Sequence, residues 1–75
     1  MRSLFDKVNN MNYYISMRIT GKPNEFAEKL NISRSTLFEY LNLLKRYGAP
    51  IEYNPLIQSY YYTDGGNFEI KFVKF

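Results

Sequence analysis

Five side chains between positions 35 and 46 could contact a ligand, and their spacing puts them on one face of a helix. They follow one another at intervals of three, one, three and four residues, and about 100° per residue places such positions on the same side. The face consists of Ser35, Phe38, Glu39, Asn42 and Arg46. Apart from the phenyl group, these side chains donate or accept hydrogen bonds, which is the chemistry of a binding surface.

The chain lacks most of the residue types that catalysis and metal binding require. It contains no cysteine and no histidine, which removes the thiolate nucleophile, the imidazole base and the usual zinc ligands. The seven acidic residues are scattered singly, and no glycine-rich phosphate loop follows a predicted strand. We therefore expect no enzyme activity, no catalytic residue, no metal site, no cofactor and no small-molecule ligand.

The composition predicts one small domain, residues 1–75, with an aromatic-rich core. Hydrophobic residues make up 45% of the chain and aromatic residues 19%, unlike the composition of a disordered segment. Charge appears within the first few residues, and no window approaches the ~20 apolar residues of a membrane span. We expect a cytoplasmic protein without a signal peptide. The net charge of +3 permits contact with a polyanion without requiring it.

Periodic apolar residues predict two helices in the first part of the chain. A stripe with spacings of four, three, four and four residues predicts a helix over about 3–19. The stripe consists of Leu4, Val8, Met11, Ile15 and Ile19. Pro23 fits the first turn of a second helix over about 23–30. Its short apolar face consists of Phe26, Ala27 and Leu30.

A third helix is predicted over about 34–47, ending at Gly48. The face opposite to the binding surface is apolar or aromatic: Leu37, Tyr40, Leu41, Leu44 and Tyr47. Between the second and third helices, Asn31 tolerates the left-handed conformation of a helix end. Ile32 can plug the turn and Ser33 can cap the third helix. These residue types predict a helix-turn-helix.

After Pro50 the spacing of the apolar residues changes from the period of a helix to the alternation of a strand. A β-ribbon is predicted over about 51–63, and a further strand over about 68–74, together forming a small antiparallel sheet. The fold class is therefore α+β: a three-helix helix-turn-helix core followed by a small β-sheet.

The order of these features resembles the winged helix-turn-helix domains of bacterial transcription regulators, especially those of sugar-responsive repressors and of the biotin repressor. The resemblance covers roughly residues 22–63. Its most specific parts are residues 32–37, with the sequence ISRSTL, and residues 44–51, with the sequence LKRYGAPI. In these parts the helix, the residues that end it and the first strand of the ribbon follow in the same order as in the family. The resemblance implies a winged helix that binds double-stranded DNA in transcription regulation.

The resemblance also implies a role for the third helix in the major groove of DNA. The residues that would face base edges are Ser35, Phe38, Glu39 and Asn42. Asparagine can pair with adenine, glutamate can accept from cytosine, and phenylalanine can pack on a thymine methyl group. The residues that would contact phosphate are Lys22, Ser33, Arg34, Lys45 and Arg46.

The ribbon leaves several alternatives open. Its turn, residues 54–59 and here called the wing tip, has no charge, whereas many winged helices carry lysine or arginine there. Leu56 and Ile57 in this turn either contact another protein or fold back onto the core. Tyrosines 60–62 are either core residues or a platform on which single-stranded bases stack. The rival function is a winged-helix module for protein interaction or oligomerisation that does not bind DNA. A homodimer through the C-terminal strand or the wing is a separate expectation.

Overall fold

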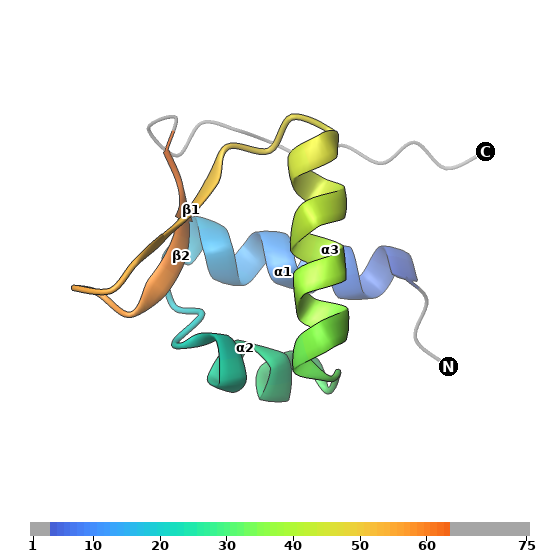
Figure 1. Ribbon diagram of the computed structural model, residues 1–75, viewed down its shortest axis with the longest axis horizontal. Coiled ribbons are helices and arrows are strands. Elements are labelled where there is room, and N and C mark those ends of the chain that lie inside the picture. The colour runs from blue at the N-terminus through green and yellow to red at the C-terminus, as the bar shows by residue number, and fades with distance from the viewer. Residues whose placement is uncertain (1–3, 64–75) are drawn as a thin grey trace.

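The computed structural model describes residues 4–63, with side chains from Asp6 onward, as three helices followed by two strands (Figure 1). The elements are α1 (Leu4–Met17), α2 (Pro23–Leu30), α3 (Arg34–Arg46), β1 (Ile51–Asn54) and β2 (Ser59–Tyr62). This order confirms the α+β winged-helix layout predicted from the sequence. The further strand expected over 68–74 lies outside the described residues.

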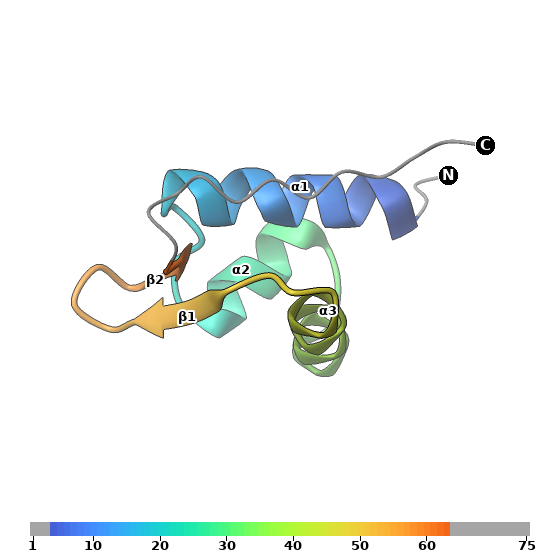
Figure 2. The ribbon, with the colours of Figure 1, turned by 90° about the horizontal axis from the view of Figure 1, so that it is seen from above.

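The two strands form an antiparallel hairpin beside the helices. Ile51 pairs with Tyr62 at the helix end of the hairpin, and Asn54 pairs with Ser59 next to the turn. Seen from above, α1 and α3 lie on opposite sides of the molecule with α2 between them, and the hairpin lies beside one end of α1 (Figure 2). The hairpin therefore closes one end of the helical core.

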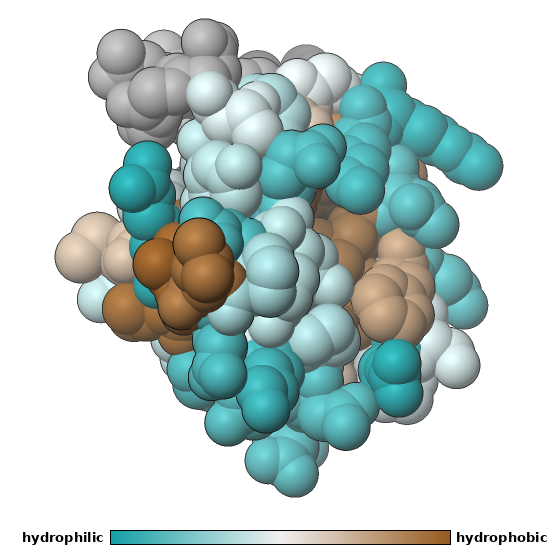
Figure 3. Space-filling model, turned by 60° about the vertical axis from the view of Figure 1, so that its left-hand side comes forward, coloured by the Kyte–Doolittle hydropathy of each residue, from teal (hydrophilic) through white to brown (hydrophobic). Residues whose placement is uncertain are grey.

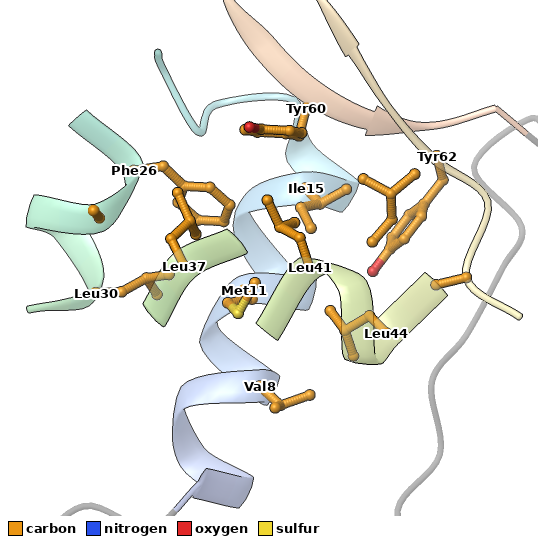
Figure 4. Packing of buried hydrophobic residues seen from close by; sticks show 13 residues of the cluster. Val8, Met11, Ile15, Phe26, Leu30, Leu37, Leu41, Leu44, Tyr60 and Tyr62 are labelled. Carbon is orange, nitrogen blue, oxygen red and sulfur yellow. The ribbon is translucent and has the colours of Figure 1, made fainter. Parts of the chain in front are cut away.

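Buried side chains from every element meet in one core (Figure 4). Met11, Phe26 and Leu37, one from each helix, are fully buried. The ring of Phe26 lies 5.8 Å from that of Tyr60, centroid to centroid, which joins α2 to β2. The other buried hydrophobic residues are Val8, Ile15, Ala27, Leu30, Leu41, Leu44, Ala49, Ile51 and Tyr62. This core fixes the orientation of α3.

The first helix ends two residues earlier than predicted, and the inclusion of Ile19 in its apolar stripe is wrong. Arg18 adopts the left-handed conformation, with φ 58°. The N–H of Ile19 donates to the carbonyl of Tyr14 at 3.0 Å, a bond typical of a helix that ends at a left-handed residue. Because the chain turns there, Ile19 leaves the apolar stripe and is 45% exposed.

The end of α3 also corrects one prediction. Tyr47 was placed on the apolar or aromatic face of the predicted helix, but it is 79% exposed. The helix ends at Arg46, and Gly48 takes a positive φ of 96° that lets the chain turn. Ala49 donates its N–H to the carbonyl of Leu44 at 3.0 Å and is buried. The turn thus puts Ala49 into the core, while Tyr47 stays outside it.

Two buried hydroxyl groups join the α1–α2 connection to β2. The backbone N–H of Thr20 donates to Ser59 Oγ at 3.1 Å, and the N–H of Tyr60 donates to Thr20 Oγ1 at 2.9 Å. The two hydroxyl oxygens lie 3.1 Å apart and are hydrogen-bonded. Thr20 and Ser59 are 0% and 1% exposed, so these bonds satisfy polar groups that water does not reach.

A further long-range hydrogen bond joins α1 to β2. The Tyr62 hydroxyl donates to Asn12 Oδ1 at 2.6 Å. Burial of the ring raises the pKa of Tyr62 from 10.0 to about 12, because an apolar environment disfavours the phenolate.

Substitution of Thr20 tests the hydroxyl pair. Thr20→Val keeps the shape of the side chain but leaves the buried N–H of Tyr60 without its acceptor. We expect a loss of about 1–3 kcal/mol in the free energy of unfolding, measured by urea denaturation. Ser16→Ala is the control, because its exposed hydroxyl bonds only within α1, to the Asn12 carbonyl, at 2.7 Å. Equal midpoints for the two variants would contradict the role given to Thr20.

Substitution of Tyr62 tests the effect of burial on its ionisation. Because the folded-state pKa is raised, the contribution of this group is complete below pH 10.0 and is lost as pH rises towards about 12. Tyr62→Phe removes the hydrogen bond, and we expect a loss of about 1 kcal/mol at neutral pH. The advantage of the unsubstituted protein should shrink in alkaline urea titrations. A difference that stays constant with pH would rule out the raised pKa.

Candidate nucleic-acid interface

The start of α2 is set by backbone geometry and one carboxylate. Gly21 has φ 76°, and a Cβ atom at this position would lie 2.8 Å from Glu25 Oε1. That same carboxylate oxygen accepts the backbone N–H of Lys22 at 2.8 Å, and Pro23 occupies the first turn. Lys22 is thereby held at the N-terminus of α2 with its side chain exposed.

The turn between α2 and α3 has the predicted chemistry. Asn31 is left-handed, with φ 57° and ψ 46°, and closes α2. The N–H of Ile32 donates to the Ala27 carbonyl at 3.0 Å, and the Ile32 side chain packs against the core. Both predictions are confirmed, and the turn fixes where α3 begins.

Ser33 caps α3 as predicted. Its Oγ accepts the N–H of Thr36 at 3.1 Å and bonds to the Thr36 hydroxyl at 2.8 Å. The cap satisfies one of the free N–H groups at the helix start. Any phosphate contact by Ser33 would therefore come in addition to this role.

The side of α3 that faces away from the core carries the predicted base-edge residues. Leu37, Leu41 and Leu44 are buried, which fixes the rotation of the helix about its axis. The four side chains of the opposite side are all exposed: Ser35, Phe38, Glu39 and Asn42. Two of them, with Arg46, line an open hollow on the helix surface whose other walls are Tyr40 and Leu43.

Arg34 and Phe38 form a pair that sequence reasoning did not identify. The guanidinium carbon of Arg34 lies 5.6 Å from the centroid of the Phe38 ring, which is a cation–π contact. Residues four apart are neighbours on a helix surface, so this spacing was the signal that could have found the pair. The structure thus joins a predicted phosphate residue to a predicted base-edge residue.

The positive charge of Arg34 also affects the pKa of Tyr60 in β2. Burial raises the pKa of Tyr60, the neighbouring hydroxyl of Tyr53 raises it further, and the positive charge of Arg34 acts in the opposite direction.

The other basic candidates lie at separate places on the two helices. Lys45 and Arg46 are exposed in the last turn of α3, and Lys22 is exposed at the start of α2. Cations in the last turn also stabilise a helix through its dipole, so this placement has a structural reason as well. All nine predicted site residues are exposed and available to a ligand.

The wing tip projects into solvent. Asn54 Oδ1 accepts the N–H of Leu56 at 2.9 Å, and Gln58 takes a positive φ of 50°. Leu56 is 92% exposed and Ile57 is 48% exposed, so the alternative in which this turn folds back onto the core is wrong. The wing-tip turn carries hydrophobic side chains at the hairpin end, where a hydrophobic patch is visible (Figure 3).

The tyrosine run belongs to the core and not to a stacking platform. Tyr60 and Tyr62 are 7% and 2% exposed. Tyr61 is half-buried on the other face of the hairpin, where the guanidinium of Arg18 lies 5.7 Å from its ring centroid. Bases could therefore not stack on the three rings in succession.

Two other features are absent from residues 4–63. That stretch has no group of three or more His, Cys, Asp or Glu residues placed to hold a metal ion. Within the same stretch, no helix has the length and apolar character needed to cross a membrane.

Comparison with known proteins places the chain in a family. A family model described as "HTH domain" matches residues 15–55, which is more than half of the chain and runs from the last turn of α1 through the end of β1. No curated protein and no solved structure matches the chain. The matched residues include the turn at Asn31, the cap at Ser33 and the whole of α3. The chain belongs to the helix-turn-helix domain family.

Proposed function

We propose that this protein binds double-stranded DNA in a sequence-specific manner, with α3 in the major groove, and that it acts in transcription regulation. The observation that carries the proposal is the polar outer face of α3. This face begins directly after the turn between α2 and α3, in a chain that belongs to the helix-turn-helix domain family. The major groove is about 12 Å wide, which admits a helix about 10–12 Å in diameter.

The exposed side chains of this face match the hydrogen-bonding groups of base edges. The amide of Asn42 can donate to and accept from adenine, and the carboxylate of Glu39 can accept from the amino group of cytosine. Ser35 can bond to either kind of group. These three side chains project from one side of a helix whose other side is held by buried leucines, which supports a fixed register on the bases.

Phosphate contacts would set the position of α3 in the groove. Lys22 at the start of α2 and Ser33 at the start of α3 lie where backbone N–H groups favour an anion. Lys45 and Arg46 would contact the backbone from the other end of α3. Because one helix reads only a few base pairs, recognition of a longer site would use two copies of the chain.

The proposal predicts that the protein enriches one sequence from a randomised duplex library. Lys45→Ala removes one proposed phosphate contact, so we expect weaker binding to every duplex and a log–log salt slope smaller by about 1. Arg18→Ala is the control, because it removes a single positive charge that directly follows α1 and contacts the ring of Tyr61 on β2. Fluorescence anisotropy over about 50–200 mM salt measures affinity and slope.

Two results would contradict this proposal. A library without an enriched sequence would refute sequence-specific binding. A Lys45→Ala slope equal to that of the unsubstituted protein would refute the phosphate contact while leaving base recognition intact.

A second candidate function is self-association through the wing tip, and the exposure of Leu56 and Ile57 favours it. Leu56 is 92% exposed at a structured turn, and removal of such an apolar side chain from water is favourable. The wing tip has no charge, whereas each copy carries a net charge of +3. Two copies that repel each other elsewhere can therefore meet at this turn without placing like charges together.

Substitution at the wing tip tests self-association. The double variant Leu56→Ser, Ile57→Ser should fold normally, because both side chains are exposed. We expect it to lose self-association in sedimentation equilibrium while keeping its affinity for a duplex with a single half-site. Tyr47→Ser is the control, since this residue is 79% exposed at the end of α3. If all three proteins sediment alike, the wing tip does not mediate self-association.

A further inference from the structure

We propose that Arg34 and Phe38 act as one reading unit, in which Arg34 recognises a guanine and Phe38 packs on the methyl group of an adjacent thymine. This inference rests on the proposed function, because it concerns the same helix in the same groove. It moves Arg34 from the phosphate contacts, where the sequence had put it, to the residues that determine base specificity.

The position of Arg34 is unfavourable with respect to the dipole of the helix. It is the first residue of α3, and the first turn of this helix contains no acidic residue. The N-terminus of a helix carries a partial positive charge, so a cation there is disfavoured. The cation–π contact with Phe38, at 5.6 Å, is a specific interaction that holds Arg34 at this otherwise unfavourable place.

The contact restricts the guanidinium group before DNA arrives. Phe38 lies one turn beyond Arg34 in the same helix, and both side chains are exposed. A guanidinium above an aromatic ring keeps its in-plane N–H groups free to donate. Because part of the arginine side chain is already ordered, less conformational entropy is lost on binding.

A restricted guanidinium plane can pair with the edge of a base. Two parallel N–H groups match O6 and N7 of guanine, which is the commonest specific contact of arginine in the major groove. A phosphate can also accept two parallel N–H groups, so the preference for a base comes from the position of Arg34 as the first residue of α3. The first residues of a recognition helix are those that contact base edges.

Phe38 adds the neighbouring base to the same unit. Its ring is 39% exposed although it also contacts Arg34, so apolar surface remains free beside the cation. In the major groove such surface can cover the methyl group of thymine, which no other base carries. The expected target therefore contains a dG next to a dT.

The test compares variants on the duplex that the unsubstituted protein selects from a random library. Arg34→Lys keeps the charge and removes the planar pair of donors. We expect about a 5- to 150-fold loss of affinity for the selected duplex, with affinity for unrelated duplexes and the salt slope unchanged. Phe38→Ser removes both the apolar surface and the ring, so it should relax the preference at the dT and weaken discrimination at the dG. Lys45→Ala is the control and should weaken all duplexes equally.

The outcomes separate this inference from the proposed function. If the unsubstituted protein selects a sequence without dG next to dT, or if Arg34→Lys retains full discrimination at the dG, the inference is wrong and the proposed function stands. If Arg34→Ala lowers affinity for all duplexes by the same factor, Arg34 is a phosphate contact. If the library yields no enriched sequence, both proposals fail. Circular dichroism confirms that each variant is folded.

Discussion

The hydrogen bonds between Thr20 and Ser59 connect parts of the chain that lie 39 residues apart. They tie the short connection before α2 to the second strand of the hairpin, at a place that water does not reach. Each buried group in this cluster would be costly without its partner. A small domain without disulfides has few other ways to hold a hairpin against its helices. The closed end of the core, and with it the position of α2, depends on this contact.

From that closed core the geometry of α3 follows. Phe26 on α2 packs against Tyr60 on β2, and the leucines of α3 pack into the space that these elements leave (Figure 4). Burial of the leucine face determines the rotation of α3 about its axis, while the Asn31 turn and the Ser33 cap determine where the helix begins. The outer face is therefore exposed as a consequence of packing, and its residues are free to vary in chemistry without disturbing the core.

Two regions of the described surface differ in polarity and charge. The outer face of α3 is polar and carries cations near both ends, with the Arg34–Phe38 pair at its start. The wing tip is apolar and uncharged, and its turn is ordered by Asn54 and by the left-handed Gln58. A polyanion would be attracted to the first region and not to the second. This difference supports a division in which α3 contacts DNA and the wing tip contacts another copy.

The sequence alone determined the order of helices and strands, the turn at Asn31, the cap at Ser33 and the exposed row on α3, because each depends on local spacing and on conformational preferences of single residues. It did not determine the end of α1, since nothing local marks Arg18 as a left-handed residue, and Ile19 was misplaced as a result. Only the tertiary structure decided that Thr20 and Ser59 are buried together and that Leu56 is exposed. These properties depend on contacts between residues far apart in the chain, and apolar periodicity carries no information about which polar groups will meet.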